Sequence, residues 1–197
     1  MKLAYLILAH HQPTLLARLV DRILSRDAHV FLHVDARTDI RPFLECLAAS
    51  GNPWTRTNLH LASQRIKVGY MAFSTVEATL ALLRQASAFG TFRSYTLLSG
   101  ADYPIQSRPH IEATLAGTRE QLIVYWKLED RPSWLHKIQY PYLTDLVPVR
   151  SPHRPNLRNP LSLVRSFPHL YWRAFRRVQP WMPRRSFPFR DLVPYGG

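Results

Sequence analysis

Apolar residues along the first 130 positions occur either in short continuous runs or in longer stretches where they recur every three or four residues. The runs LAYLILA (3–9) and HVFLHV (29–34) predict strands that are buried on both faces. The stretch QPTLLARLVDRILS (12–25) predicts a helix with one apolar stripe, and Pro13 suits a position near its start. Such alternation is typical of βαβ units, so the sequence predicts an α/β fold with a mainly parallel, Rossmann-like sheet flanked by helices.

The same patterns predict the other elements of this part. Further strands are expected at 58–63, 94–99 and 121–126, and further helices at 41–50 and 74–89. Gly51 is expected to close the first of these helices, and a capping box from Ser74 to Glu77 is expected to open the second.

Prolines become frequent from residue 131 onward and exclude long helices there, apart from a piece around LYWRAFRRV (170–178). We therefore predict two parts, residues 1–130 as the α/β part and residues 131–197 as a Pro-rich part that wraps it or carries a long loop. The chain ends at RDLVPYGG with no closing element, so we expect the fold to be incomplete at the C-terminus.

Basic residues are concentrated in the second part. The formal net charge is +13, and residues 131–197 contain 12 of the 26 Lys and Arg residues but only Asp145 and Asp191 of the 13 acidic ones. This imbalance favours phosphate groups, an anionic membrane surface or nucleic acid as partners, although a solvated basic surface explains it as well. No recognised nucleic-acid-binding motif accompanies the charge.

The single cysteine, Cys46, excludes an intrachain disulfide, and no Cys/His spacing indicates a zinc site. No apolar stretch approaches the roughly 20 residues needed to cross a bilayer. The apolar N-terminal run is interrupted by His10-His11 and has no small-residue cleavage site, so we expect neither a signal peptide nor a transmembrane helix. These features predict a reducing compartment, the cytoplasm or the cytoplasmic face of a membrane.

Polar residues that follow the strands directly are the candidates for ligand contacts, because open α/β sheets bind ligands beyond the carboxyl ends of their strands. They are His10 and His11 after the first strand, Asp35 and Arg37 after the second, and Ser99 and Asp102 after YTLLS. No GxGxxG or GxxxxGK[ST] motif occurs, so neither a dinucleotide fingerprint nor a P-loop is supported. His33, inside a strand, is interpreted as a packed core histidine rather than a ligand.

Four segments, in this order and spacing, resemble the core-2/I-branching β-1,6-N-acetylglucosaminyltransferases and the related peptide O-xylosyltransferases. They are LAYLILAHHQP, FLHVDART, VGYMAFSTVEATLALLRQA and YTLLSGADYPIQS. The resemblance covers residues 3 to 112, and it returns in MPRRSFPFRDLVPYGG, which resembles the segment that leads into the family's Gly-Gly-Ser-x-Trp motif. It implies a GT-A fold and an inverting transfer of GlcNAc or xylose from a UDP-sugar to a hydroxyl of a glycan, glycolipid or protein acceptor.

The resemblance also implies a set of site residues. Leu8 and His10 would lie beside the uridine, and Asp35 would accept a hydrogen bond from the uracil ring with help from Arg37. The further residues implied for donor binding are Val68, Tyr70, Ser99 and Asp102. Tyr70 stands where the family has a tryptophan, and Met71 adds bulk where the family has glycine. Tyr195, Gly196 and Gly197 would lie on the acceptor side, as part of a basic acceptor-side segment, 131–197, of the same catalytic domain.

Asp102 belongs to a Gly-Ala-Asp sequence, whereas the usual GT-A metal site uses Asp-x-Asp. One carboxylate is a poor site for Mg²⁺ or Mn²⁺, so we expect no metal cofactor, in agreement with the metal-independent transfer that the resemblance implies. Asp102 would then hold the donor sugar or order its own loop. The catalytic base of the family lies well beyond the Gly-Gly-Ser-x-Trp motif, so it is expected beyond residue 197, and this chain alone is expected to be inactive.

An alternative function is a basic, non-catalytic protein that binds nucleic acid or an anionic membrane surface. The four ordered motifs favour the transferase, with a UDP-sugar and a glycan or glycolipid as partners and no nucleic acid. Peripheral membrane association would then use the basic residues 131–197. Their arginine run is interpreted first as surface charge, next as an acceptor-side or lipid-facing patch, and last as a diphosphate contact; it comprises Arg173, Arg176, Arg177, Arg184 and Arg185.

Overall fold

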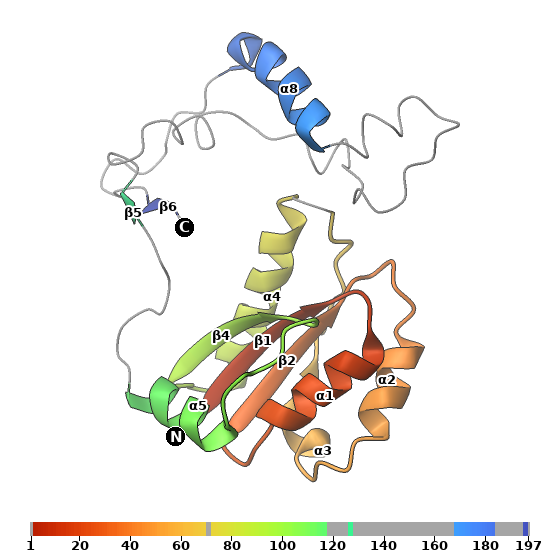
Figure 1. Cartoon of the computed structure of the whole chain (residues 1–197), viewed down its shortest axis with the longest axis vertical. Helices are drawn as coiled ribbons and strands as arrows, with labels where there is room; N and C mark the ends of the chain where they lie inside the picture. The colour runs from red at the N-terminus through yellow and green to blue at the C-terminus, as the bar shows by residue number, and fades with distance from the viewer. Residues whose placement is uncertain (1, 70–71, 118–125, 128–167, 184–194, 197) are drawn as a thin grey trace. The chain divides into compact units, whose positions relative to one another are not determined.

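The computed structural model describes residues 2–69, 72–117, 126–127, 168–183 and 195–196 (Figure 1). The chain divides into two compact units. The first comprises Met1–Val68 and Phe73–Arg119, and the second comprises Gly69–Ala72 and Glu120–Gly197.

The first unit contains a parallel sheet of four strands in the order β3-β2-β1-β4. The strands are β1 (Leu3–Ala9), β2 (Ala28–Val34), β3 (Leu59–Leu61) and β4 (Ser94–Ser99). All seven residues of β2 are buried and six of the seven in β1, as expected for strands covered on both faces. The predicted α/β fold with a parallel sheet is confirmed, and it is consistent with a GT-A-like arrangement.

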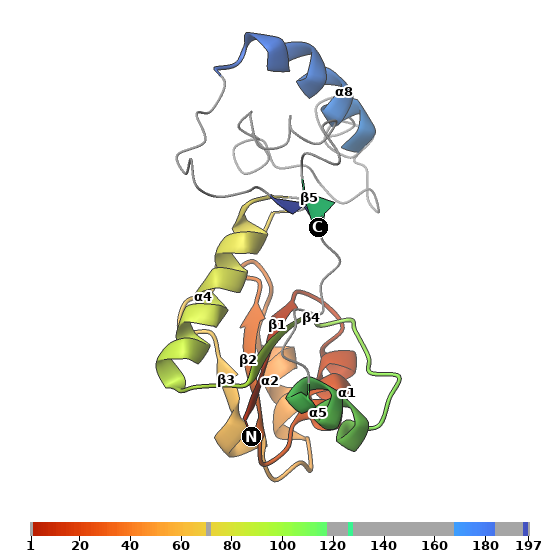
Figure 2. The same cartoon turned by 90° about the vertical axis from the view of Figure 1, so that its left-hand side faces the viewer.

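Helices cover both faces of this sheet (Figure 2). They are α1 (Pro13–Ile23), α2 (Arg41–Ala48), the short α3 (Thr55–Asn58), α4 (Ser74–Phe89) and α5 (Arg108–Gly117). On one face α1 packs against α2, and α5 lies on the same side, as Figure 2 shows. On the other face α4 crosses β1 and β2. The core therefore has two layers, one on each side of the sheet.

The apolar stripe of α1 supplies much of the first layer. Its residues Leu16, Leu19, Val20 and Ile23 are buried against β1 and β2. The second layer is smaller, and in it Leu82 and Ala86 of α4 meet side chains of β1 and β2. The periodicity of the sequence thus identified the apolar stripe that α1 buries.

Two predicted helix ends are wrong. The N-cap of α4 is Phe73, and it makes no side-chain capping bond, so the expected capping box from Ser74 to Glu77 does not form. Ser74 is instead the first helical residue and is buried. Gly51 does not close α2 either, because the helix ends at Ala48 with the right-handed Ala49 as its C-cap.

Helix α5 was not predicted. It is anchored to the α1 side by polar contacts, since the Arg108 guanidinium donates to the carbonyl oxygens of Asp21 at 2.9 Å and Arg22 at 3.0 Å. The hydroxyl of Ser25 donates to Glu112 Oε1 at 2.7 Å. None of the residues of α5 is buried, so its sequence has no apolar stripe from which the helix could be predicted.

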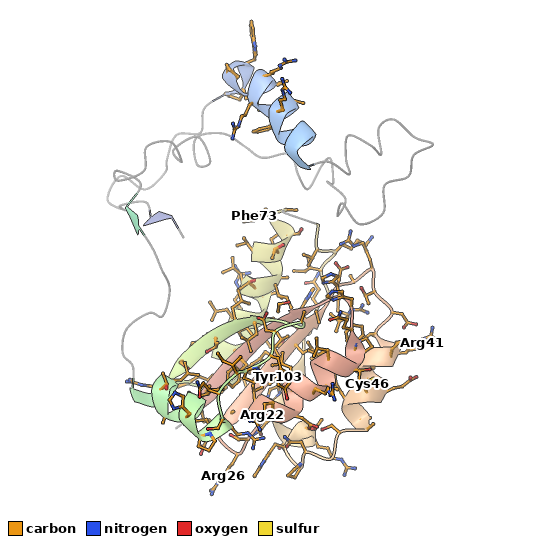
Figure 3. All side chains as sticks on the ribbon, viewed as in Figure 1. Arg22, Arg26, Arg41, Cys46, Phe73 and Tyr103 are labelled. Carbon is orange, nitrogen blue, oxygen red and sulfur yellow. The ribbon has the colours of Figure 1, made fainter. Side chains whose placement is uncertain are left out.

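Side chains at the rim of the first unit point outward in Figure 3, among them Arg41 on α2 and Phe73 at the start of α4. Cys46, on α2, is a free, half-buried thiol whose sulfur lies 3.9 Å from the Thr14 hydroxyl.

The described parts of the second unit are short. They are α8 (Pro168–Val178), which continues into the 3-10 turn η3 (Gln179–Trp181), and an antiparallel pair of β5 (Trp126–Lys127) with β6 (Tyr195–Gly196). The helix expected at 170–178 is confirmed. Of the strand expected at 121–126, residues 121–125 lie outside the described residues. Within the described ranges, no helix is both long and apolar enough to cross a bilayer.

Candidate functional site

The strand order places a topological switch between β1 and β4. After β1 the chain passes through α1 on one face of the sheet and then forms β2 and β3 on one side of β1. It then passes through α4 on the opposite face and forms β4 on the other side of β1. The carboxyl ends of β1 and β4 are the point where ligands bind in such sheets. Polar residues expected at this edge do lie there, because His10 follows β1, Asp35 follows β2 and Ser99 ends β4.

Asp35 is the most completely bonded side chain of this edge. Its Oδ1 accepts hydrogen bonds from the backbone N–H of Arg37 at 2.8 Å and from Arg37 Nε at 3.1 Å. Its Oδ2 accepts from Arg37 Nη2 at 2.8 Å and from the backbone N–H of Val68 at 3.1 Å. A carboxylate has about four lone-pair positions, so all of them are in use.

Burial alone would raise the pKa of Asp35, because it disfavours the charged form. The hydrogen bonds from the side chain and backbone of Arg37 outweigh it, so the pKa lies below its ordinary value. The same pairing raises the pKa of Arg37. Asp35 is therefore ionised at neutral pH and is a weak base in this state.

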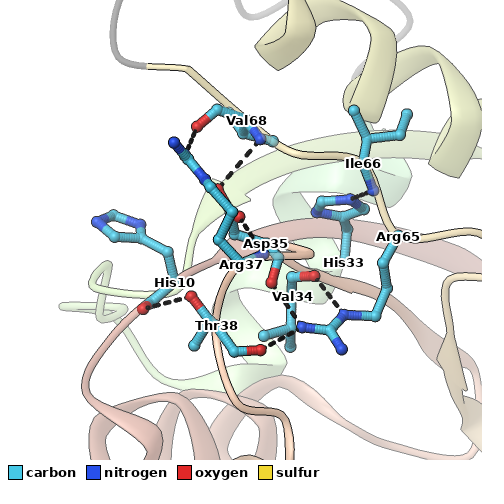
Figure 4. A network of polar contacts seen from close by, with 9 residues as sticks. All are labelled: His10, His33, Val34, Asp35, Arg37, Thr38, Arg65, Ile66 and Val68. Carbon is cyan, nitrogen blue, oxygen red and sulfur yellow. Dashed lines mark hydrogen bonds and ion pairs between the residues drawn. The ribbon is translucent and has the colours of Figure 1, made fainter. Parts of the chain in front are cut away.

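Arg37 itself is far more accessible than its partner. Its side chain is 54% exposed, while that of Asp35 is 6% exposed. Its Nη2 donates a hydrogen bond to Asp35 and a second one to the carbonyl oxygen of Val68 (Figure 4). The guanidinium thus links the end of β2 to the segment after β3 and leaves one side open to solvent.

Two residues that were not predicted as site residues complete this network. The guanidinium of Arg65 donates to the carbonyl oxygens of Val34, Asp35 and Thr38. His33 is buried, as predicted for a core histidine, and its Nε2 accepts a hydrogen bond from the backbone N–H of Ile66 at 2.8 Å. Figure 4 shows Arg65, Ile66 and Val68 arrayed along the end of β2.

An accepting Nε2 requires the Nδ1–H tautomer of a neutral His33. Burial lowers the pKa of His33, the charge of Asp35 opposes that shift and the charge of Arg65 adds to it. The ring is therefore neutral when this hydrogen bond is made.

His10 and His11 stack on one another at the end of β1, with ring centroids 4.2 Å apart, and both are exposed. The carbonyl oxygen of His10 accepts from Thr38 Oγ1 at 3.2 Å, which ties this loop to the turn after β2. Burial and the neighbouring His11 lower the pKa of His10. An exposed pair of stacked histidine rings thus borders the Asp35 network.

The end of β4 is closed by Asp102. Its Oδ2 accepts from the backbone N–H of Ser99 at 2.8 Å, and its own N–H donates to the carbonyl oxygen of Ser99 at 3.0 Å. This bond orders the loop of Asp102, and a contact to the donor sugar, the other role expected for this residue, stays a prediction. Gly100 lies against β1, since a Cβ at this position would come within 2.7 Å of Ala9 Cβ.

The remaining predicted residues lie as follows. Leu8 is half-buried on β1 and is paired in register with Ser99 of β4. Tyr70 and Gly197 are outside the described residues, and Tyr195–Gly196 belong to β6 in the second unit. In the part of the chain that the structure describes, no group of three or more His, Cys, Asp or Glu residues could hold a metal ion.

Comparison with known proteins identifies the family of this chain. The model of the Core-2/I-Branching enzyme family matches residues 3–148 of the 197 in this chain. The chain belongs to this family. A β-1,3-galactosyl-O-glycosyl-glycoprotein β-1,6-N-acetylglucosaminyltransferase of Bos taurus is 32% identical to it over 110 residues. That alignment covers 55% of this chain and 25% of the bovine protein, so the chain spans about a quarter of the length of this relative. The predicted family resemblance is thereby confirmed.

Proposed function

We propose that the carboxyl edge of β1, β2 and β4 is the donor side of a glycosyltransferase, and that it binds the nucleotide of a UDP-sugar. One observation carries this proposal: a buried, ionised carboxylate, Asp35, is fixed at the sheet edge of a Core-2/I-Branching chain, next to the switch point. Ionisable side chains whose pKa is shifted by a specific charged partner are frequent at binding sites, and the position of Asp35 at this edge supports such a role.

Recognition of the uracil ring then requires an exchange of hydrogen bonds. All acceptor positions of Asp35 are occupied without ligand, so an incoming ring N–H replaces one of its present donors. The donors from Arg37 Nε and Nη2 are the ones that can leave, because this side chain is half-exposed, whereas the two backbone donors are fixed. The freed guanidinium stays close enough to contact a uracil oxygen or a phosphate.

Leu8, His10 and Val68 are proposed to wall the uridine, and Ser99 to lie on the side of the donor sugar. Tyr70, at the position of the family's tryptophan, is proposed as a further donor-binding residue. Leu8 and Val68 are half-buried apolar residues. The N–H of Val68 contacts Asp35, and Leu8 pairs in register with His33 on β2. His10 is an exposed ring next to that network, and such rings stack on nucleobases.

The transfer is proposed to need no metal. The Asp102 carboxylate uses one oxygen to hold the N–H of Ser99, and Gly100 stands where a second carboxylate would be needed. Basic side chains then neutralise the leaving diphosphate, the electrostatic role that a metal fills in other transferases.

The sugar and its acceptor are finer proposals. The name of the bovine relative supports GlcNAc as the donor sugar, and xylose is the alternative. A hydroxyl of a glycan or glycolipid is the proposed acceptor, with Tyr195, Gly196 and Gly197 on its side. Inverting transfer needs a general base, and Asp35 is unsuited to that role because its pKa is lowered.

An anionic lipid surface is a further proposed partner, for the second unit and on the cytoplasmic side of a membrane. Arg173, Arg176 and Arg177 of α8 are exposed, and Trp181 in η3 is 88% exposed. Arginine forks bind phosphate, and tryptophan prefers the membrane interface. Sedimentation with phosphatidylglycerol vesicles, but not with phosphatidylcholine vesicles, is expected. It should weaken in Arg176→Gln/Arg177→Gln but not in Arg84→Gln, an exposed control on α4.

Calorimetric titration tests the main proposal. UDP, UDP-GlcNAc and UDP-xylose are titrated into the chain with EDTA and, separately, with Mn²⁺. Binding that is equal in both conditions and lost in Asp35→Ala supports a metal-independent donor site. Absence of UDP binding together with tight binding of random RNA would favour the alternative function, a basic nucleic-acid-binding protein.

A further inference from the structure

The turn that presents Asp35 and Arg37 is held both by β1 and by a segment outside the sheet. Pairing between β2 and β3 ends at Leu32 and Leu61, with one further bond from the N–H of Ala62 to the Leu32 carbonyl. On its other side β2 pairs with β1 as far as Val34, and the N–H of Asp35 donates to the Ala9 carbonyl at 2.9 Å. Beyond Asp35 the turn leaves both ladders and is closed by the N–H of Thr38 on the Asp35 carbonyl at 2.9 Å. Its remaining backbone groups need partners from outside the sheet.

Arg65 supplies such a partner. Its Nε donates to the Val34 carbonyl at 2.9 Å, and its Nη2 donates to the Asp35 carbonyl at 2.6 Å and to the Thr38 carbonyl. These carbonyls flank the Asp35–Arg37 pair on both sides, so one rigid guanidinium spans the whole turn. Figure 4 shows the fork of Arg65 between Val34 and Thr38.

Residues 65–68, which we name the strap, are held in return by the turn and by β2. The N–H of Ile66 donates to His33 Nε2, and the Ile66 carbonyl accepts from the N–H of Ala36 at 3.0 Å. The N–H of Val68 donates to Asp35 Oδ2. The strap and the turn thus hold one another by hydrogen bonds in both directions. Among these bonds, those of the Arg65 side chain are the ones that reach several carbonyl oxygens at once.

We propose that Arg65 is the positioning residue of the donor site, setting the place of the Asp35 carboxylate and the Arg37 guanidinium through three backbone carbonyls. It acts without touching the nucleotide. The consequence for binding rests on the proposed donor function, whereas the positioning of the turn does not.

The geometry requires arginine rather than a positive charge alone. The planar guanidinium directs its donors along fixed, diverging directions, which suits carbonyls on two sides of a turn. A lysine ammonium is a compact point charge on a flexible stem, and it cannot hold the same three oxygens in fixed directions. Arg65→Lys should therefore fail to restore what Arg65→Gln loses.

The test uses Arg65→Gln, Arg65→Lys and the control Arg41→Gln. Arg41 is an exposed arginine on α2 whose partner is Asp39, so its substitution removes the same charge without touching the turn. Two quantities are measured on each chain: the hydrogen-exchange rates of the backbone amides of Ala36 and Val68, and the dissociation constant of UDP.

Both Arg65 variants should speed exchange at Ala36 and Val68 by about tenfold or more while the amides of β1 keep their rates. Both should also weaken UDP binding by about tenfold or more, and Arg41→Gln should change neither quantity. Unchanged local exchange, full recovery in Arg65→Lys, or faster exchange throughout the sheet would overturn the proposal. Local exchange that rises with no change in UDP affinity would overturn it too.

The two proposals fail in different ways. If the unaltered chain does not bind UDP, the donor function fails, and the exchange rates still decide whether Arg65 fixes the turn. If the unaltered chain binds UDP and the Arg65 variants bind it equally well, the donor function stands and the positioning role is rejected.

Discussion

Arg37 Nη2 lies 2.8 Å from Asp35 Oδ2, and the two side chains differ sharply in exposure, 54% against 6%. The buried member of the pair therefore depends on the exposed one. Burial raises the pKa of Asp35, and the hydrogen bonds from Arg37 bring it below its ordinary value. The stability that this pair contributes is present above the unfolded pKa of the carboxyl and is lost as the pH falls through the lower, folded pKa.

Replacement of Arg37 by Ala should raise the pH at which the stability contributed by this pair is lost. Without the guanidinium, burial acts on Asp35 with less opposition, so its folded pKa rises and the carboxylate destabilises the fold at neutral pH by about 1–3 kcal/mol. Urea unfolding between pH 7 and pH 4 measures this. Arg41→Ala, which breaks the exposed pair of Arg41 with Asp39, is the matched control and should leave the curve nearly unchanged. Equal curves for both variants would contradict the dependence of Asp35 on Arg37.

Gly100 should not tolerate alanine. A Cβ there would lie 2.7 Å from Ala9 Cβ, and the side chain of Ala9 has no rotamer by which to move away. We expect Gly100→Ala to destabilise the chain by about 1–3 kcal/mol and to weaken UDP binding, because the turn from Ser99 to Asp102 must shift.

The combination with Ala9→Gly removes the colliding methyl group and should restore most of the loss in urea unfolding, a coupling that a double-mutant cycle measures. Gly51→Ala is the control, since a Cβ at Gly51 meets nothing within 4 Å. A double variant that is no more stable than Gly100→Ala alone would show that the contact with Ala9 is not the cause.

The role of Asp102 can be separated into charge and loop order. Asp102→Asn keeps an oxygen that can accept from the N–H of Ser99, whereas Asp102→Ala does not. If the residue only orders its loop, Asn should keep the affinity for UDP-GlcNAc, and Ala should lower it by about threefold to tenfold, the equivalent of one modest hydrogen bond. Calorimetry with UDP and UDP-GlcNAc distinguishes the cases, because a contact to the sugar weakens UDP-GlcNAc in both variants and leaves UDP unaffected.

The main strands were predictable because their apolar runs are continuous and end at polar residues. The bounds of β1 and β4 agree with the sequence pattern, and β2 gains only Ala28. The strand expected from Asn58 is shorter, since Asn58 ends α3 and its side-chain amide donates to the carbonyls of Ser25 and Arg26. Tertiary hydrogen bonds of this kind do not produce a periodic pattern in the sequence, so they cannot be predicted from it.

The candidate site was predictable only in part, and for a related reason. Asp35, His10 and Asp102 were found because strand ends at a switch point identify them by position. Arg65 and the bond between His33 and Ile66 join residues about thirty positions apart, and their partners are backbone groups. Every residue has the same backbone carbonyl group, so a pattern of side chains in the sequence cannot predict which carbonyl accepts such a hydrogen bond.

The pair of His29 and His60 predicts a loss of stability in mild acid. His29 Nδ1 lies 3.1 Å from His60 Nε2, and aromatic rings surround the pair, with Phe92 at 5.3 Å from His29 and Phe89 at 4.4 Å from His60 between ring centroids. Burial, with the neighbouring charges of His60 and Lys2, lowers the pKa of His29 to about 4. Burial also lowers the pKa of His60.

The sign follows from linkage. In the unfolded chain His29 takes up a proton near its ordinary pKa of 6.5, while the folded chain resists it until the pH is about 4. The unfolded state therefore binds more protons between these values, and stability is present above 6.5 and falls with pH inside this window. A shift of this size corresponds to at most about 3 kcal/mol, and solvent access to the rings makes the real loss smaller.

His29→Gln should flatten this dependence. The variant loses ring packing and is expected to be about 1–2 kcal/mol less stable at pH 7, but its stability should fall less between pH 7 and pH 4.5 than that of the unaltered chain. His10, His33 and His60 keep their own lowered pKa values, so the slope is reduced and not abolished. His110→Gln, on the exposed surface of α5, should give a curve parallel to that of the unaltered chain. A parallel curve for His29→Gln as well would mean that this buried ring does not control the acid response.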